Sequence, residues 1–224
     1  SEILWITCLV LFHMEFFNPD ASKSFCGNGS RCAFAFWRSL VGDEPGQIAG
    51  DHTSARFTAI DGEHGADVRG TWEVGVTLRP PSEIEFLDER MDFIDTGSPH
   101  LLVWVDDPSQ LDLITEAHAF RYNVRFRRLG VNVNFLRWDS RSERLDMRTY
   151  ERGVEAETLS CGTGVTAAAL DAIHRGVAGD TAVSVRTRGG DLRVEAYYDQ
   201  VGSMPRTVTL IGPVVHVFSG SISI

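Results

Sequence analysis

Two stretches decide the fold: FCGNGSRCAFAF at 25–36 and SCGTGVTAAAL at 160–170. Each places a cysteine before two glycines that flank one small polar residue, and then continues into residues that favour helix. The pattern predicts helices over Gly29–Leu40 and Gly164–Arg175. Because the C-G-[NT]-G motif recurs, first at Cys26 and then at Cys161, the chain is predicted to contain two halves of similar topology.

Short segments rich in Val, Ile, Phe and Thr, bounded by Gly, Pro and Asp, surround both predicted helices and indicate strands. Pro80 and Pro81 mark a boundary between the halves. The predicted class is α+β, with two pseudo-repeated halves, each a curved and mostly antiparallel sheet around a central helix. We expect the N-terminal half to comprise 1–81 plus 208–224, and the C-terminal half 82–207. The longest strand candidates are Ile3–Phe12 and Val68–Leu78, a late one is Val214–Phe218, and a third, shorter helix is predicted at Gln110–Phe120.

The composition excludes several classes of protein. A formal charge of −10 over 224 residues argues against nucleic acid or an anionic membrane as partner. The ten apolar residues of Ile3–Phe12 are too short to span a bilayer, and no basic region precedes them as in a signal peptide. Four irregularly spaced cysteines without a C-x-x-C pair favour neither a disulfide scaffold nor a zinc site. We therefore expect a cytoplasmic protein with reduced thiols and no metal.

Lysine usage bears on the cofactor. Lys23 is the only lysine among 21 Lys and Arg residues, and it lies in the polar segment ASKS. A pyridoxal-phosphate enzyme needs a lysine for its Schiff base. If the chain acts at an amino-acid α-carbon, we expect it to do so without a cofactor.

Cys26 and Cys161 each precede a predicted helix, where the helix dipole and unpaired N–H groups can lower a thiol pKa to roughly 3.5–7.5. Two opposed thiols suit inversion of a tetrahedral carbon, since one removes a proton and the other returns one on the opposite face. Backbone N–H groups at the two helix starts would stabilise the charge that develops on a carboxylate. Cys8 and Cys32 are predicted to pack in the core.

The chain resembles the diaminopimelate epimerase family over nearly its whole length. The resemblance rests on five stretches in the family's order: FFNPDASKSFCGNGSRCAFAF (16–36), DTGSPH (95–100), GVNVNF (130–135), YERGVEAETLSCGTGVTAAAL (150–170) and TLIGPVVHVFSG (209–220). It implies a small-molecule substrate, diaminopimelate, whose LL and meso forms are interconverted for lysine biosynthesis without a cofactor.

The resemblance also implies residue roles. Cys26 and Cys161 would be the catalytic thiols, and His100 and Glu151 would contact the reacting amino group. The remaining contacts would bind the reacting carboxylate (Gly27, Asn28, Gly162, Thr163) or the distal end of the substrate (Asn18, Asn132, Arg152), with Ser98 at a position where asparagine is common.

The chain departs from the family at its start, where a glycine-rich turn containing G-N-D-F and one further contact before Asn18 are absent. We expect a truncated or shortened first half, whose exposed sheet edge would favour association, so a homodimer stays open. Three alternatives remain: a proline or hydroxyproline racemase of the same fold, a catalytically silent binding protein, and a thiol redox protein with a working Cys26–Cys161 disulfide.

Overall fold

The computed structural model describes residues 3–7, 12–18, 21–40, 53–81, 83–179, 181–200 and 203–221, with 3–7 described by backbone alone. The helices are α1 (Gly27–Leu40), α2 (Leu113–Arg121), α3 (Gly162–His174) and the 3₁₀ turn η1 (Pro108–Gln110). The strands are β1 (Ile3–Thr7), β2 (Phe12–Phe17), β3 (Ser54–Ala59), β4 (Gly62–Val68), β5 (Glu73–Leu78), β6 (Ile84–Asp88), β7 (Met91–Asp95), β8 (Pro99–Trp104), β9 (Asn132–Asp139), β10 (Arg144–Glu151), β11 (Ala156–Thr158), β12 (Ala182–Thr187), β13 (Gly190–Tyr197) and β14 (Thr207–Pro213).

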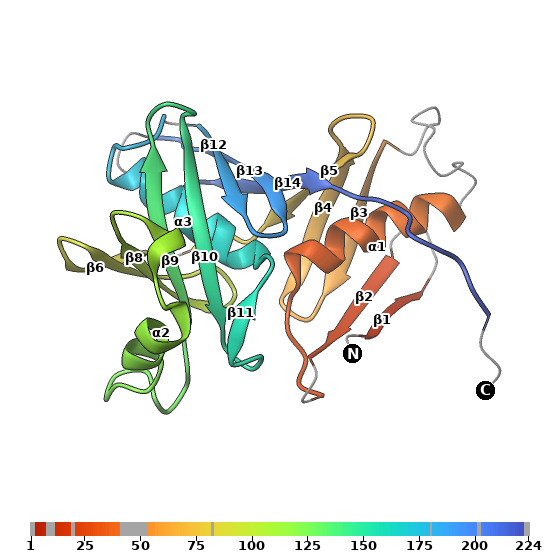
Figure 1. Cartoon of the computed structure of the whole chain (residues 1–224). Coiled ribbons are helices and arrows are strands. Elements are labelled where there is room, and N and C mark those ends of the chain that lie inside the picture. The colour runs from red at the N-terminus through yellow and green to blue at the C-terminus, as the bar shows by residue number, and fades with distance from the viewer. Residues whose placement is uncertain are drawn as a thin grey trace.

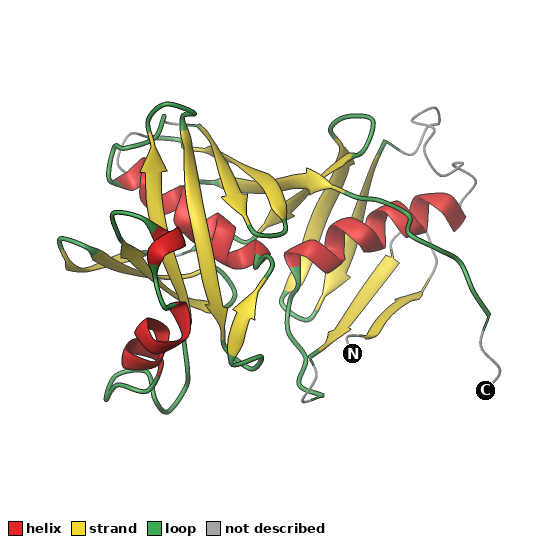
Figure 2. Cartoon of the chain, viewed as in Figure 1, coloured by secondary structure: helices red, strands yellow, loops and turns green. Residues whose placement is uncertain are grey.

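The described strands form one continuous ladder in the order β1-β2-β3-β4-β5-β14-β13-β12-β10-β9-β8-β7-β6, with β11 paired to β10. Three pairs are parallel, β2–β3, β8–β9 and β10–β12, and the other described pairs are antiparallel. Figures 1 and 2 show the strands curving around two helices, α1 and α3. The α+β class is therefore confirmed.

The internal repeat is visible in the order of elements. In the first copy, β2 is followed by α1 and then by β3, which pairs parallel to β2 and continues into the antiparallel strands β4 and β5. In the second copy, β10, α3, β12, β13 and β14 repeat the same sequence of pairings. Strands β5 and β14 then pair with each other, which joins the copies. The exact limits of the two halves stay a prediction.

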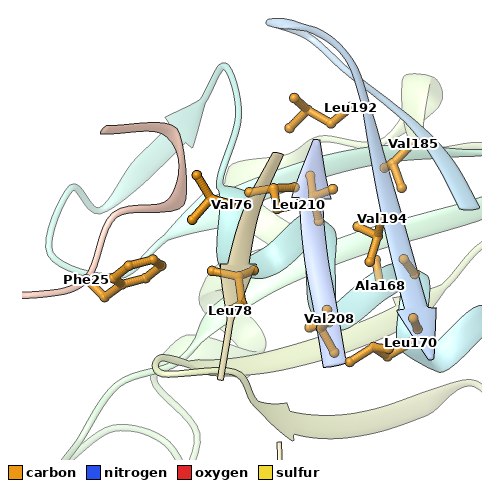
Figure 3. Packing of buried hydrophobic residues seen from close by; sticks show 14 of the residues in the cluster. Phe25, Val76, Leu78, Ala168, Leu170, Val185, Leu192, Val194, Val208 and Leu210 are labelled. Carbon is orange, nitrogen blue, oxygen red and sulfur yellow. The ribbon is translucent and has the colours of Figure 1, made fainter. Parts of the chain in front are cut away.

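The two helices are buried to different degrees. Every residue of α3 from Gly162 to Ala172 is buried, as expected for a helix enclosed by sheet. Figure 3 shows Ala168 and Leu170 of α3 near Val194 of β13 and Val208 of β14. Helix α1 buries one face only, so the prediction that Cys32 packs in the core is wrong: it lies on the exposed face. Cys8 lies outside the described residues.

Several predicted elements differ from those observed. Val68–Leu78 is divided into β4 and β5 by a turn at Gly70, which the apolar residues on either side obscured in the sequence. Phe12 belongs to β2, which pairs antiparallel with β1, so Ile3–Phe12 is not one strand. Val214–Phe218 forms no strand. Its apolar residues resemble a strand in sequence, but most of their side chains are exposed. The third helix begins at Leu113, after the separate turn η1.

Candidate active site

The first turns of α1 and α3 meet at two glycines. A methyl group added at Gly27 would lie 3.6 Å from Cα of Gly162, and one added at Gly162 would lie 3.3 Å from the backbone N of Asn28. Both added groups would also crowd Leu210 Cδ2, at 2.8 and 2.9 Å. The Asn28 side chain crosses the junction and donates to the Ser160 carbonyl at 3.1 Å. The helices lie nearly end to end (Figure 1), which brings the two C-G-[NT]-G motifs together.

Cys26 precedes α1 and is half-buried. Its Sγ accepts the backbone N–H of Gly29 at 3.2 Å, as predicted for a thiol at a helix start. Arg31, one turn further along, is only 6% exposed and donates from Nη1 to Asn28 Oδ1 at 3.1 Å. Burial lowers the pKa of Arg31, while the thiols of Cys32 and Cys26 act in the opposite direction. This buried cation was not predicted, because an arginine inside a helix is usually a surface residue.

Cys161 precedes α3 and is 7% exposed. Burial raises the pKa of its thiol to about 12, and the charges of Glu151 and Cys26 add to this increase. The Thr163 hydroxyl, 3.5 Å from Sγ, and the Gly164 N–H act in the opposite direction. The expectation of a lowered pKa is therefore wrong for Cys161 in the free protein, because loss of hydration outweighs the donors at the helix start.

Cys26 and Cys161 directly precede the two glycines of this junction, so these residues lie near each other, and Cys26 contributes to raising the pKa of Cys161. They are brought together by the junction at Gly27 and Gly162, although 135 residues separate them in sequence (161 minus 26). Within the described part of the chain, no group of three or more His, Cys, Asp or Glu side chains is arranged to hold a metal ion.

Three strand ends supply the other predicted residues of the C-terminal half. Strands β8 and β9 run parallel with His100 beside Asn132, and β10 returns antiparallel to end at Glu151. Asn132 joins these ends: its Nδ2 donates to Ser98 Oγ at 3.0 Å, and its Oδ1 accepts the backbone N–H of Arg152 at 2.9 Å. The sheet topology thus gathers residues from three separate motifs at one edge.

His100 is fully buried, and burial together with the nearby Arg152 charge lowers its pKa to about 3. The imidazole is therefore neutral at physiological pH. Its Nε2 lies 3.0 Å from Thr163 Oγ1, on the first turn of α3. A contact between His100 and a substrate amino group stays a prediction.

Two predicted residues for the distal end of the substrate are held in different ways. Arg152 is exposed, and its Nη1 donates to the Leu129 carbonyl at 3.0 Å. Asn18, at the end of β2, donates to Ser22 Oγ at 2.9 Å and accepts from Ser24 Oγ at 3.2 Å. These bonds stabilise its own turn, and a substrate contact of Asn18 stays a prediction.

Comparison with known proteins shows the family of the chain. The sequence profile of diaminopimelate epimerase matches residues 93–217. The diaminopimelate epimerase of Aquifex aeolicus is 38% identical over 223 residues, covering 95% of this chain and 75% of the relative. That of Chlorobaculum tepidum is 36% identical over 220 residues, covering 95% and 80%. The chain belongs to the diaminopimelate epimerase family. Its curated relatives carry the name of an isomerase, so the predicted enzyme class is confirmed.

Solved structures extend the likeness of fold beyond this family. A hydroxyproline epimerase from Agrobacterium vitis, solved with bound trans-4-hydroxy-L-proline, superposes with a TM-score of 0.64 and covers 95% of this chain and 71% of its own. Its sequence is 15% identical to this chain, which supports a shared fold and says nothing of a shared substrate. As for the membrane, no described helix has both the length and the apolar character needed to cross one.

Proposed function

We propose that this protein is a cofactor-independent diaminopimelate epimerase that interconverts LL- and meso-diaminopimelate with Cys26 and Cys161 as its acid and base. The observation that carries the proposal is the junction of the two helix starts. It holds Cys26 and Cys161 near each other, each directly before the first turn of a helix. The curated relatives with the same name, at 38% and 36% identity, support the choice of substrate.

The proposed step begins when one thiolate removes the α-proton of the substrate. The C–H bond breaks, its electron pair moves toward the adjacent carboxylate, and the sulfur becomes a thiol. The opposite thiol then gives its proton to the other face of the same carbon and becomes a thiolate. Protons are conserved, the centre is inverted, and the two sulfurs exchange roles for the reverse reaction.

The burial of Cys161 fits the proton-donating role. A thiol with a pKa of about 12 holds its proton in the free protein, so it is prepared to act as the acid when Cys26 acts as the base. Backbone N–H groups at the starts of α1 and α3 would bind the carboxylate as it gains charge. The neighbouring residues Asn132 and Arg152 would hold the distal end of the substrate, where a guanidinium suits a second carboxylate.

Exchange with solvent tests the proposal. Incubating the protein with LL-diaminopimelate in heavy water should yield the meso form carrying deuterium at the inverted carbon. Cys26→Ala and Cys161→Ala should each lower turnover by about 10²–10⁴-fold or more. Cys32→Ala, which alters an exposed thiol of α1, is the matched control and should retain activity.

The same assay separates the alternatives. Turnover of L-proline or trans-4-hydroxy-L-proline without turnover of diaminopimelate would replace the proposed substrate. Absence of exchange at high enzyme concentration would favour a binding protein. An increase of activity on oxidation would favour a redox role, because a Cys26–Cys161 disulfide would remove both acid/base thiols.

A further inference from the structure

A buried chain of polar groups leads from β9 to the Cys161 sulfur. Asn134 Nδ2 lies 3.2 Å from His100 Nδ1, His100 Nε2 lies 3.0 Å from Thr163 Oγ1, and Thr163 Oγ1 lies 3.5 Å from Cys161 Sγ. Asn134 and His100 are fully buried, and Thr163 is 6% exposed. A methyl group added at Gly164 would lie 2.7 Å from Asn134 Oδ1, so the start of α3 packs directly on this chain.

The orientation of the Asn134 amide is fixed by its neighbours. Its Nδ2 lies 3.1 Å from the Leu101 carbonyl, an oxygen that can only accept. The NH₂ group has two hydrogens, and the Asn132 carbonyl is the most distant of its three neighbours at 3.4 Å, so the hydrogens are directed to Leu101 and to His100 Nδ1. Its Oδ1 accepts the Thr149 hydroxyl at 3.0 Å. The group that faces His100 Nδ1 is therefore the NH₂ group, a donor. His100 Nδ1 must then accept, and because the ring is neutral, its single proton lies on Nε2.

This tautomer decides where the Thr163 proton can go. With a proton on His100 Nε2, the ring donates to Thr163 Oγ1, and the hydroxyl keeps its own proton for another acceptor. Cys161 Sγ is such an acceptor within reach. With the opposite tautomer, the unprotonated Nε2 would accept the hydrogen bond of the Thr163 hydroxyl. The hydroxyl would then have no hydrogen left to donate to the sulfur.

We propose that Asn134 is a positioning residue: by donating to His100 Nδ1 it keeps the imidazole proton on Nε2, and so directs the Thr163 hydroxyl proton to the Cys161 thiolate. The hydrogen bond would form when Cys161 has given up its proton. The sulfur is buried, so this donor replaces part of the hydration that the thiolate loses. The relevance to turnover rests on the function proposed above, whereas the tautomer and the ionisation of Cys161 can be measured without turnover.

Other charged and titratable groups also change the pKa of Cys161, and their influence must be distinguished from that of the hydrogen bond from Thr163. Glu151 at the end of β10 and Cys26 before α1 both raise its pKa. Arg152 lies close enough to His100 to lower the pKa of the imidazole. A substitution that changes charge at position 134 would act on Cys161 through space as well as through the chain of hydrogen bonds, so the test needs a second substitution that breaks the chain.

The first measurement is the nitrogen NMR spectrum of His100 in ¹⁵N-histidine-labelled protein. The wild-type ring should carry its proton on Nε2, and Asn134→Asp, whose carboxylate can only accept, should move it to Nδ1. Thr149→Val is the matched control, because it removes the hydrogen bond to Asn134 Oδ1 and leaves the donor to His100 in place. A proton on Nδ1 in the wild type would overturn the proposal.

The second measurement is the rate at which iodoacetamide alkylates Cys161 at a fixed pH, followed by peptide mass spectrometry under a phosphine reductant. Thr163→Val should slow alkylation by about 10-fold or more, the effect of losing a hydrogen bond to a charged group. Thr163→Ser, which retains the hydroxyl, should stay within about 3-fold of the wild type.

A double-mutant comparison completes the test. Asn134→Asp should slow alkylation of Cys161 strongly when Thr163 is present and much less in the Thr163→Val background. An equal effect in both backgrounds would show a through-space charge effect and overturn the proposal. Should Asn134→Asp fail to fold, Asn134→Leu removes the donor without adding charge and is judged by the same two readouts. Failure of diaminopimelate turnover with these results intact would count against the proposed function alone.

Discussion

Gly27 and Gly162 lie against each other at the point where α1 and α3 begin, and a methyl group on Gly27 would be in van der Waals contact with Cα of Gly162, at 3.6 Å. The contact is capped by Leu210, a fully buried residue of β14. Strand β14 pairs with β5 of one repeat and β13 of the other. The strand that joins the two copies therefore also supplies the side chain that seals the junction between their helices.

Alanine at either glycine should destabilise the protein by about 1–3 kcal/mol through overpacking. The two variants should differ in how far a smaller side chain at position 210 relieves the steric crowding. At Gly27 the contact below 3 Å is with Leu210 Cδ2, whereas Gly162 is also crowded by Asn28 at 3.2 and 3.3 Å. Leu210→Val should therefore restore more stability to Gly27→Ala than to Gly162→Ala in denaturant unfolding. Equal recovery would show that Leu210 is not the side chain that limits the contact.

Glu151→Gln should separate thiol ionisation from turnover. The charge of Glu151 raises the pKa of Cys161, so its removal should lower that pKa from about 12. At a fixed pH below 12, Cys161 should then be alkylated faster by iodoacetamide. Turnover should nevertheless fall if Glu151 contacts the substrate amino group as proposed. Slower alkylation in Glu151→Gln would contradict the effect of the Glu151 charge on the Cys161 pKa.

Gly130→Ala should displace the Arg152 side chain, which it crowds more than any other neighbour. Gly130 has a φ of +76°, and a methyl group there would lie 2.6 Å from Arg152 Cδ. Gly176→Ala is a matched control, since its φ is +68° and an added methyl group meets nothing within 4 Å. Both should lose about 1–2 kcal/mol of stability from the left-handed backbone. An increase in KM for diaminopimelate is expected only for Gly130→Ala, and an equal increase in both variants would contradict the proposed role of Arg152.

A buried carboxyl pair should make stability depend on pH. Asp171 of α3 is fully buried, accepts Trp104 Nε1–H at 2.7 Å, and lies beside Asp92 and Arg175. Burial and the neighbouring Asp92 raise the pKa of Asp171 to about 8. The folded protein keeps this proton up to about pH 8, whereas the unfolded chain releases it near the ordinary aspartate pKa of about 4. The stabilisation from the raised pKa is therefore complete below about pH 4 and is lost as the pH rises toward 8.

The free energy of unfolding should therefore fall between about pH 4 and pH 8, with a slope from this group of up to about 1.4 kcal/mol per pH unit. Asp171→Asn, which keeps an acceptor for Trp104 and a donor for Asp92, should remove this component. Asp191→Asn, an exposed aspartate of β13, should leave the slope unchanged. The measurement is urea unfolding at a series of pH values, and a wild-type slope that persists in Asp171→Asn would refute the assignment.

The sequence alone determined the local elements on which the site depends. The C-G-[NT]-G motifs at Cys26 and Cys161 predicted both long helices to within two residues at each start, because glycine and helix-favouring residues act over a few neighbours. Their repetition predicted the doubled topology, and the motifs around them indicated the family. Turns inside apolar runs, such as the one at Gly70 between β4 and β5, were missed because the flanking residues favour strand on both sides.

Tertiary structure alone decided the chemistry of those residues. The pKa of Cys161 depends on its burial, and the tautomer of His100 depends on Asn134, which lies 34 positions away in sequence. Thr163 meets His100 across 63 positions, and the Arg31 side chain is buried in the folded protein. Ionisation and proton position follow from hydration and from partners brought together by folding, so neighbouring residues in the sequence cannot specify them.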